Sequence, residues 1–527
     1  MLASHARPSV PDGPVNTPRR GDQHVRRVAR GDSERDRIRD DTHAMLATLD
    51  RPRPIEASRI VLVGAGIVNL VTALALIERG ARVELVDAGP DPRTDPRWTM
   101  LGATHGGDDG RMCSFTEADG FNDRSDTVRS NHDALGSTIE DGGWLTVPVD
   151  RLTSRERRWI DDFLSLPHWQ AETFRRDIHS FNIAGAAGWA ALRRGLPALF
   201  ENVAHRPGLL RVYTDHPSWA AARATPDDLG SLRRILPAAA LRRDHPAWRA
   251  AVDSGELVGG IEIEGFTVAI HPLARGILDR LDQRGARLRW QCRIRALERR
   301  GETVTGLRST ETTIRGDHYV LSPGATGGAL LDGTRCDGKI QGMVGVWARL
   351  PQTDPWSCSV KIQREGHVGE HTNAILGQDR TGRPNIVLGA GYGFLGERAL
   401  ELSSQQLVHL EQALDTTARR LLPTAYAEAR RDGSFHGERR ACVRPCTSTG
   451  LGLFEILPAS AGGRLLIAGG HNTGGFTQAP AVADAVCATL SGEPHPMQWL
   501  YRPDRQHFHA GSSASPVGST RPAMATR

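Results

Sequence analysis

The chain has 527 residues, a formal net charge of +5 and 39% hydrophobic residues, which is enough for two or three domains with ordinary cores. Its basic side chains are interleaved with acidic ones and form no block with interspersed aromatic residues, so nucleic-acid binding is not expected. No run of about 18 apolar residues occurs, so no membrane span is expected. The seven cysteines are odd in number and scattered. This indicates a reducing compartment rather than a disulfide framework, and we expect a cytoplasmic location.

The two ends of the chain differ in composition from the rest. Residues 1–54 are rich in Arg, Asp, Pro and Gly, and a tail over 503–527 contains mainly small and polar residues. Neither segment buries enough apolar surface to offset the entropy of ordering, so both are expected to be disordered. The ordered chain opens with RIVLVGAG (59–66), an apolar run that ends in two glycines. A helix over 67–80 and a strand over 81–89 complete a strand–turn–helix–strand unit.

The turn of this unit, VGAGIVN, carries Gly64 and Gly66 of a G-x-G-x-x-G pattern, with Asn69 in the third position. The first glycine permits a tight turn, and the second lets the backbone approach a pyrophosphate. The helix N-terminus then offers free N–H groups to the phosphates. Asp87, with Ala88 beside it, follows Gly64 by 23 residues, close to the spacing of the acid that binds a ribose hydroxyl. The unit predicts a dinucleotide site, and an ordinary glycine turn is the alternative.

The chain then leaves this pattern for a glycine-rich loop over 102–119 and returns to it only near residue 258. The elements expected after that point are a helix over 273–284, strands over 287–292, 303–308 and 318–322, a strand-rich stretch over 346–395, a helix over 403–421, and a last unit over 464–492 whose helix starts near Pro480. A nucleotide domain that is split in this way favours FAD over NAD, although a soluble NAD dehydrogenase is the alternative.

Four stretches carry a resemblance to a known family. They are VLVGAGIVNL with VELVDAG, GATHGGDDGR (102–111), the block from HPLARG to SPGATG (271–327), and RPCTSTG with LLIAGGHNTGGFTQAPAVADAV. Together they resemble the D-amino-acid oxidase superfamily of FAD-dependent oxidoreductases, which includes glycine oxidase, sarcosine oxidase and amino-acid dehydrogenases. The resemblance implies an α/β fold with a Rossmann-like, discontinuous FAD-binding domain and a mixed-sheet α+β substrate domain. The implied FAD-binding parts are 55–150, 256–335 and 438–502, and the substrate parts are 151–255 and 336–437.

The resemblance also implies which residues contact FAD. The loop that packs near the flavin ring supplies Thr104, His105 and Arg111, and Gly324 lies in SPGATG (322–327), which closes on the pyrophosphate and adenosine. The turn under the flavin comprises Gly470, His471, Asn472, Thr473, Gly474, Gly475 and Phe476. Its N–H groups and the helix that follows would stabilise the negative charge of reduced flavin. For the loop residues, ordinary hydrogen bonding within the loop is the alternative.

The stretch ERRACVRPCTSTG (438–450) resembles the segment that faces the flavin. Arg444 matches the arginine that pairs with a substrate carboxylate in glycine oxidase-like members, and a structural arginine is the alternative. Cys442 occupies the position of the cysteine that bonds covalently to FAD in sarcosine oxidase-like members, and an inert buried thiol is the alternative. A metal site at Cys442 and Cys446 is not expected, because no second Cys/His pair stands at ligand spacing. Tyr392 is a candidate for the substrate site, with a core tyrosine as the alternative.

The expected activity is oxidation of the C–N bond of an amino acid or amine by hydride transfer to flavin N5, with His105, Tyr392 and Arg444 as the catalytic candidates. The alternatives are a FAD-dependent 2-hydroxy acid dehydrogenase and a non-catalytic FAD-holding subunit. The electron acceptor is oxygen or another oxidant. Lys339 and Lys361 are the only lysines, and neither matches the family's oxygen-activating position, which weakens the oxidase interpretation. The uncharged turn over 473–479 indicates a site that is not built for several anions.

Overall fold

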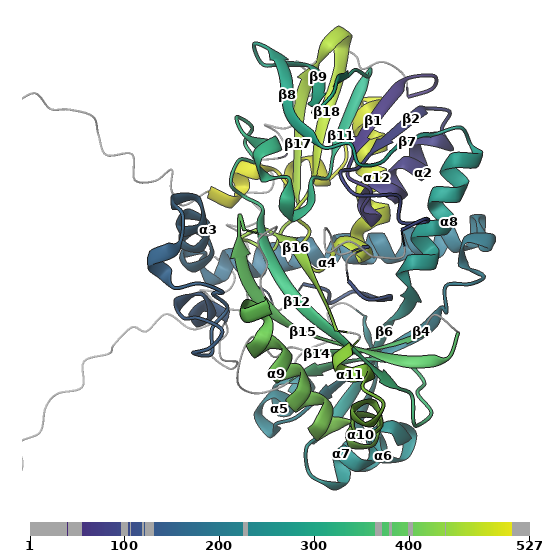
Figure 1. Ribbon diagram of the computed structural model, residues 1–527, viewed down its shortest axis with the longest axis vertical. Coiled ribbons are helices and arrows are strands. Elements are labelled where there is room, and N and C mark those ends of the chain that lie inside the picture. The colour runs from purple at the N-terminus through teal and green to yellow at the C-terminus, as the bar shows by residue number, and fades with distance from the viewer. Residues whose placement is uncertain are drawn as a thin grey trace, which may run out of the picture.

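The computed structural model of the chain describes residue 39 and residues 55–95, 104–105, 107–118, 121, 131–224, 230–363, 372–378, 382–398, 404–437 and 439–507. Apart from residue 39, the expected disordered arm over 1–54 lies outside these described residues, and so does most of the expected tail. Two large sheets form the two halves of the molecule (Figure 1). The α/β fold with two sheets and packed helices that the sequence predicted is confirmed.

The first sheet has nine strands in the order β10-β9-β17-β18-β11-β1-β2-β7, with β8 paired to β9. The strands are β1 (Arg59–Val63), β2 (Arg82–Val86), β7 (Arg287–Arg289), β8 (Ile294–Arg300), β9 (Thr303–Ser309), β10 (Thr313–Ile314), β11 (His318–Leu321), β17 (Leu453–Ala459) and β18 (Gly463–Gly469). The run β18-β11-β1-β2-β7 is parallel throughout. The central strands β1, β11 and β18 are almost entirely buried, as expected of parallel strands that are covered by helices, whereas the edge strand β7 is partly exposed.

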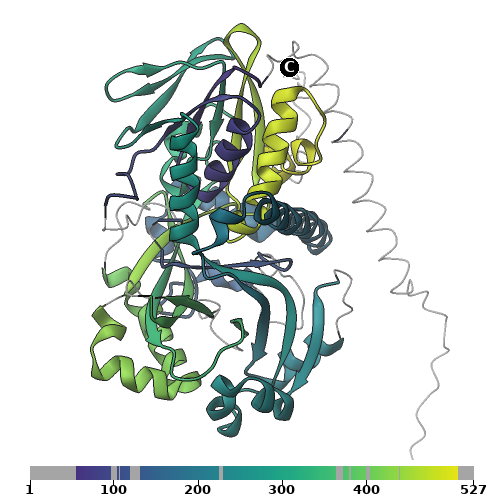
Figure 2. The same cartoon turned by 90° about the vertical axis from the view of Figure 1, so that its right-hand side faces the viewer.

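Four helices belong to this half: α2 (Ile67–Ile77), α4 (His168–Gly195), α8 (Ile270–Gln283) and α12 (Gly475–Ser491). Figure 2 shows α2 beside α12, with α4 crossing between the two sheets. The predicted start of the last helix near Pro480 is wrong, because α12 begins at Gly475 and contains Pro480. Proline lacks the N–H that would bond to the carbonyl of Phe476 four residues earlier. The indole of Trp189 on α4 donates to that carbonyl instead, at 2.8 Å.

The second sheet also has nine strands, in the order β16-β12-β15-β14-β13-β4-β6-β3, with β5 paired to β6. The strands are β3 (Gly110–Ser114), β4 (Arg206–Tyr213), β5 (Leu232–Pro237), β6 (Gly259–Ala269), β12 (Gln341–Pro351), β13 (Ser359–Gln363), β14 (Thr372–Gln378), β15 (Pro384–Gly396) and β16 (Arg440–Cys446). Most neighbours are antiparallel, but β13 and β4 are parallel. The sheet is therefore mixed, as the sequence predicted.

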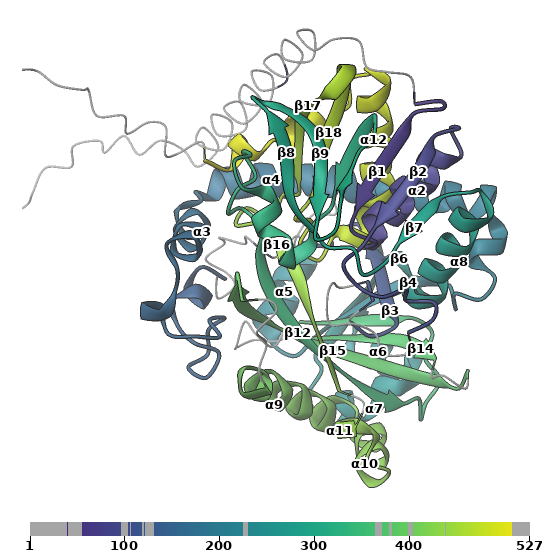
Figure 3. The same cartoon turned by 45° about the horizontal axis from the view of Figure 1, so that its top comes forward.

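Helices cover the outer face of this sheet (Figure 3). They are α9 (Ser404–Leu421), α10 (Pro423–Arg431) and α11 (Ser434–Gly437), and other helices stand around the rim: α3 (Ser154–Ser165), α5 (His216–Ala224), α6 (Ala238–Asp244) and α7 (Arg249–Asp253). Apolar side chains of α9 and α10 form one core with β12, β15 and β16. The opposite face of the sheet is directed toward the first half of the molecule.

Three strands belong to a different sheet from the one that the implied domain boundaries assign to them. The boundaries assign β3, β6 and β16 to the FAD-binding parts, but all three are hydrogen-bonded into the second sheet. Each strand adjoins a segment of the first half, and β6 runs directly into α8. The chain thus crosses between the halves at strand ends, and local composition alone does not mark these crossings.

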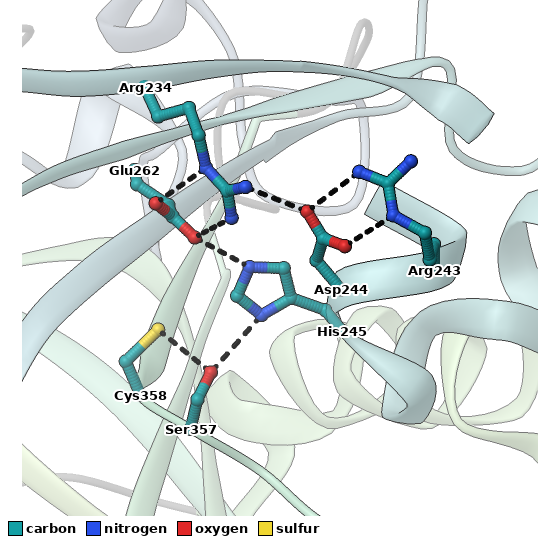
Figure 4. Close-up of polar contacts among 7 residues, drawn as sticks. All are labelled: Arg234, Arg243, Asp244, His245, Glu262, Ser357 and Cys358. Atoms are coloured by element: carbon teal, nitrogen blue, oxygen red, sulfur yellow. Dashed lines mark hydrogen bonds and ion pairs between the residues drawn. The ribbon is translucent and has the colours of Figure 1, made fainter. Parts of the chain in front are cut away.

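A polar network fixes the end of the second sheet that includes β5 and β6 (Figure 4). Arg234 grips Glu262 with two hydrogen bonds of 3.0 and 2.7 Å and also donates to Asp244 at 2.7 Å. The imidazole of His245 lies 3.0 Å from Glu262 and 3.2 Å from the Ser357 hydroxyl. The network joins β5 and β6 to the segment after α6 and to the residues before β13. Its position explains how the short edge strand β5 is held.

The end of the described chain also differs from the sequence expectation. Residues Pro503–His507 form a 3₁₀-helix after α13 (Met497–Leu500), although disorder was expected from residue 503. The Arg505 side chain is fully buried and donates to the buried carboxylate of Asp177 on α4 at 2.6 Å. Its guanidinium also lies over the Phe174 ring, at 4.9 Å from the ring centroid. A buried ion pair therefore orders this segment. Among the described helices, none is both long and apolar enough to cross a membrane.

We predict that Arg505→Met destabilises the protein by about 3–5 kcal/mol, because it leaves the Asp177 carboxylate buried without its cation. Urea denaturation measures this change in the free energy of unfolding. Arg175→Met is the matched control on α4, the helix that carries Asp177, since Arg175 forms an exposed pair with Glu172 and its loss should cost less than about 1 kcal/mol. Equal effects of the two substitutions would contradict a buried role for Arg505.

Candidate functional site

The turn after β1 is held by an unusually close approach to the end of β11. Gly64 has a φ of 98°, and a Cβ there would lie 2.3 Å from the carbonyl oxygen of Ser322. Asn69 is fully buried and donates from Nδ2 to the carbonyls of Val63 and Gly64 at 2.8 and 2.9 Å. The Ser322 hydroxyl lies within hydrogen-bond distance of both Asn69 Oδ1 (3.0 Å) and the Ala468 carbonyl (2.5 Å). Asn69 therefore supports the turn rather than facing a ligand.

The backbone on the other side of this turn is open. Gly66 has an ordinary φ of −72° and precedes α2 without a side-chain cap, and only the Thr104 hydroxyl, at 3.8 Å, would meet a Cβ there. Thr104 accepts the N–H of Ile67 at 2.9 Å. Asp87, at the end of β2, accepts the N–H of Ala65 at 2.7 Å. A glycine turn, a helix N-terminus and an acid thus meet where parallel strands end, which fits a dinucleotide.

His105 and Arg111 flank this turn on the side of the second sheet. The Nε2 of His105 donates to the Ala65 carbonyl at 2.8 Å, so the imidazole contacts the glycine turn itself. Burial lowers the pKa of His105 and keeps the ring neutral. Its Nδ1 is buried without a hydrogen-bond partner in the described part of the chain, which leaves an acceptor for a ligand. Arg111 donates to the backbone carbonyls of Asp108 and Gly110, both at 2.6 Å. The imidazole of His105 therefore lies against the glycine turn after β1.

The turn between β18 and α12 is fixed to the end of β16. Gly470 and Asn472 have positive φ values of 68° and 52°. The Asn472 side-chain oxygen accepts the N–H of Thr447 at 2.9 Å, and the Asn472 backbone N–H donates to the Pro445 carbonyl at 3.1 Å. Burial lowers the pKa of His471 to about 4, so this imidazole is neutral at physiological pH. The turn thus offers a neutral imidazole and the start of α12.

The residues around this turn differ in how far they are buried and in whether their side chains can reach a ligand. Gly474 precedes the first residue of α12, Gly475, and Thr473 is only partly buried. The Phe476 side chain points into the core, where its ring lies 4.9 Å from Trp189 and 6.1 Å from Phe266. Only the backbone of Phe476 is therefore available to a ligand. Gly324 begins a short 3₁₀ turn after β11 with a φ of 63°, and no atom of the described residues lies within 4 Å of a Cβ built there.

Arg444 lies between aromatic rings on the face of the second sheet away from α9 and α10. Its guanidinium carbon is 4.8 Å from the centroid of the Tyr392 ring and 5.7 Å from that of Trp347. One nitrogen donates to the Gly391 carbonyl at 2.8 Å. The guanidinium lies directly over Gly345, where any Cβ would collide with it. Among the described residues, no carboxylate forms an ion pair with Arg444. The structure therefore brings two of the predicted residues, Arg444 and Tyr392, together.

Cys442 shares this face of β16 and is fully buried. Burial raises the pKa of its thiol, and the nearby Arg111 and Arg444 only partly oppose this effect. The thiol is therefore protonated at neutral pH, which lowers its reactivity. All seven cysteines of the chain are free thiols. Within the described part of the chain, no group of three or more His, Cys, Asp or Glu side chains is placed to hold a metal ion.

Sequence reasoning missed Trp347, Gly345 and Trp144, whose ring stacks on Tyr392 with centroids 4.9 Å apart. One signal was present in the expected strands. Glycines occupy alternate positions 389, 391 and 393 of β15, and glycine within a strand marks a close approach of other groups. At Gly389 that group is the indole of Trp347, whose Nε1 would lie 2.6 Å from a Cβ.

The fold and the glycine turn define a dinucleotide-binding oxidoreductase, and comparison with known proteins gives its family. Residues 59–489 match the family model described as FAD dependent oxidoreductase, DAO. The chain belongs to this family, and FAD is its cofactor. It is 26% identical to D-amino acid dehydrogenase 2 of Ralstonia nicotianae over 442 residues, which covers 80% of this chain and 93% of that protein. The family resemblance predicted from the sequence is confirmed.

Solved structures share the fold. Iminodiacetate oxidase from Chelativorans sp. BNC1 aligns with a TM-score of 0.56 at 18% identity, over 84% of this chain and 99% of that one. L-proline dehydrogenase from P. horikoshii aligns with a TM-score of 0.55 at 13% identity, over 86% of this chain and 99% of that one. At these identities the likeness establishes the fold alone.

We predict that replacing each of the two glycines of the turn by alanine has different effects on FAD binding and on the stability of the FAD-free protein. Gly66→Ala should weaken FAD binding by roughly 10- to 100-fold, because the added methyl group would push the phosphates of FAD away from the backbone N–H groups and weaken their charge-assisted hydrogen bonds. Gly64→Ala should also lower the stability of the FAD-free protein by at least about 1–3 kcal/mol, through the contact with Ser322 and the positive φ. FAD titration and thermal unfolding of both variants separate the two effects. Equal loss of FAD-free stability would contradict the open position of Gly66.

Proposed function

We propose that this FAD-dependent oxidoreductase is an amino-acid dehydrogenase that oxidises a C–N bond beside a carboxylate. The observation that carries the proposal is Arg444. This guanidinium is held between two aromatic rings and has no carboxylate partner among the described residues. A planar guanidinium that is oriented in advance binds a carboxylate through two parallel charge-assisted hydrogen bonds. The named activity of the Ralstonia relative, D-amino acid dehydrogenase, supports the same substrate class.

Each residue of the site has a role in placing the substrate. Arg444 binds the carboxylate, and the rings of Tyr392 and Trp347 restrict the guanidinium to one plane. Fixing the carboxylate in this way limits the positions of the adjacent carbon and nitrogen, so that less orientational entropy is lost in the reaction. Bound FAD supplies the chemistry of a two-electron acceptor for the hydride of the substrate. Water then hydrolyses the released imine to a keto acid and ammonia.

Two neutral imidazoles lie on the cofactor side of the site. His105 and His471 are both uncharged at neutral pH because burial lowers their pKa values. Neither imidazole therefore adds positive charge beside the cofactor, and the negative charge of the reduced cofactor is left to the N–H groups of the turn and the start of α12. The substrate is expected to enter with its amine unprotonated, so no side chain of the site has to act as a strong base.

The two lysines favour a dehydrogenase over an oxidase. Lys361 forms an ion pair with Glu117 at 2.7 Å. Lys339 is buried, and its charged neighbours are Asp162, Glu455 and Asp504 rather than residues around Arg444. Neither amine is thus available to activate oxygen in the way that sarcosine oxidase-like members do. We infer that the electron acceptor is an oxidant other than oxygen.

Anaerobic bleaching of the flavin absorbance with a panel of D- and L-amino acids tests the activity. Bleaching with stoichiometric release of ammonia and a keto acid supports the proposal. Bleaching by 2-hydroxy acids alone, without ammonia, would show the hydroxy acid dehydrogenase instead. A protein that binds FAD but is bleached by neither class would be a FAD-holding subunit.

We predict that Arg444→Lys lowers kcat/KM for amino acids by about 10- to 100-fold and Arg444→Met by about 10²- to 10⁴-fold, because the substrate carboxylate loses one or both charge-assisted bonds. Steady-state kinetics with an artificial electron acceptor measure both values. The matched control is the amine that lacks the carboxylate, for which Arg444 has no charge to bind. An equal loss for the amino acid and the amine would contradict carboxylate recognition.

We predict that FAD is bound without a covalent bond, because the Cys442 thiol stays protonated in its buried position. After acid precipitation of the purified protein, the flavin absorbance should appear in the supernatant. A yellow pellet that becomes colourless in Cys442→Ala would instead place the Sγ atom at the flavin edge and contradict the prediction.

A further inference from the structure

Strand β16 presents a second arginine on the same face as Arg444. Residues two and four apart on a strand point to one side, so Arg440, Cys442 and Arg444 face the site together. The intervening Ala441 and Val443 face the opposite side, where they join the core under α9 and α10. Two cations therefore stand on the side of β16 that carries the proposed substrate site.

Arg440 has no compensating partner in the described part of the chain. Its Nε is buried and makes no hydrogen bond there, and no carboxylate forms an ion pair with it. Other arginines nearby are paired: Arg349 on β12 grips Asp108 with bonds down to 2.6 Å, and Arg439 donates to Glu411 at 2.7 Å. Arg440 is half-buried, but its buried Nε–H loses its hydrogen bond to water without gaining an acceptor, which is costly, and a bound anion would remove that cost.

The two guanidinium groups are closer than their positions in the sequence suggest. Four residues along a strand separate two Cα atoms by about 13 Å. However, Arg444 lies over Gly345, which is paired with Cys442, and beside the ring of Trp347, which is paired with Arg440. The guanidinium of Arg444 has thus moved along the strand toward Arg440.

The charged residues near Arg440 indicate where its side chain lies. Burial lowers the pKa of His271 at the start of α8, and the charges of Arg111, Arg440 and Arg349 add to this effect. Asp109 accepts the backbone N–H of His271 at 2.7 Å. Arg440 therefore extends toward the region where the loop before β3 meets α8. The carboxylates there are Asp108, which is taken by Arg349, and Asp109.

We propose that the substrate is an amino acid with a second anionic group, with one carboxylate on Arg444 and the other on Arg440. The proposal rests on the proposed function and names its substrate class: acidic amino acids, or N-substituted amino acids that carry a second carboxylate. It departs from the expectation drawn from the uncharged turn over 473–479, because the cations come from β16, a different element.

Matched substrate pairs test the second anion. Aspartate and asparagine, and glutamate and glutamine, differ in one carboxylate at nearly equal size. We expect kcat/KM for the acid to exceed that for the amide by about 10- to 100-fold in at least one pair and one enantiomer, as for a charged hydrogen bond. In Arg440→Met this ratio should fall to about one, and Arg440→Lys should restore part of it. Arg439→Met removes an equal charge next to β16, where the arginine is paired with Glu411, and should leave the ratio unchanged.

Two results would overturn the proposal while the proposed function stands. The first is amino-acid oxidation in which the acid and the amide have equal kcat/KM in the unaltered protein. The second is an acid-to-amide ratio of kcat/KM that Arg440→Met leaves unchanged. If both substrates were slowed alike and the flavin spectrum of the substrate-free protein were altered, Arg440 would be assigned to the cofactor or the fold. Failure of every amino acid to bleach the flavin would instead count against the proposed function itself.

Discussion

The contact between Gly64 and the carbonyl of Ser322 is the constraint on which the site depends. It requires a residue without a Cβ at the end of β1, and it sets the ends of β1 and β11 side by side. Asn69 and the Ser322 hydroxyl then join this turn to the end of β18. Because three parallel strands end at one place, the N-terminus of α2 and the turn before α12 are brought to the same edge of the sheet.

Strand β16 transmits this arrangement to the second half of the molecule. It is hydrogen-bonded into the second sheet through β12, yet its end is tied to the turn under the cofactor by Asn472, Thr447 and Pro445. A displacement of the turn therefore also displaces Arg444, only three residues before Thr447. The residue proposed to bind the substrate is thus fixed by one short strand relative to the turn proposed to bind FAD.

Glycines and aromatic rings shape the substrate side. Gly345 and Gly389 remove side chains from β12 and β15, and the space is taken by the guanidinium of Arg444 and the indole of Trp347. A cation between rings keeps its attraction to them while its outer N–H groups remain available to an anion. The same sheet face carries Arg440 and Arg444 without carboxylate partners among the described residues, so an excess of positive charge is built into it.

The sequence by itself determined the glycine turn, Asp87, the family and the split FAD-binding half, because these features depend on short-range spacing and on backbone freedom. It also placed Arg444 and Tyr392 among the candidates. Only the tertiary structure decided that Asn69 and the Phe476 side chain are structural, that β3, β6 and β16 pair in the second sheet, and that Arg505 is buried against Asp177. These outcomes arise from contacts between residues far apart in the chain, such as Trp189 with the carbonyl of Phe476. Local sequence patterns do not predict such contacts.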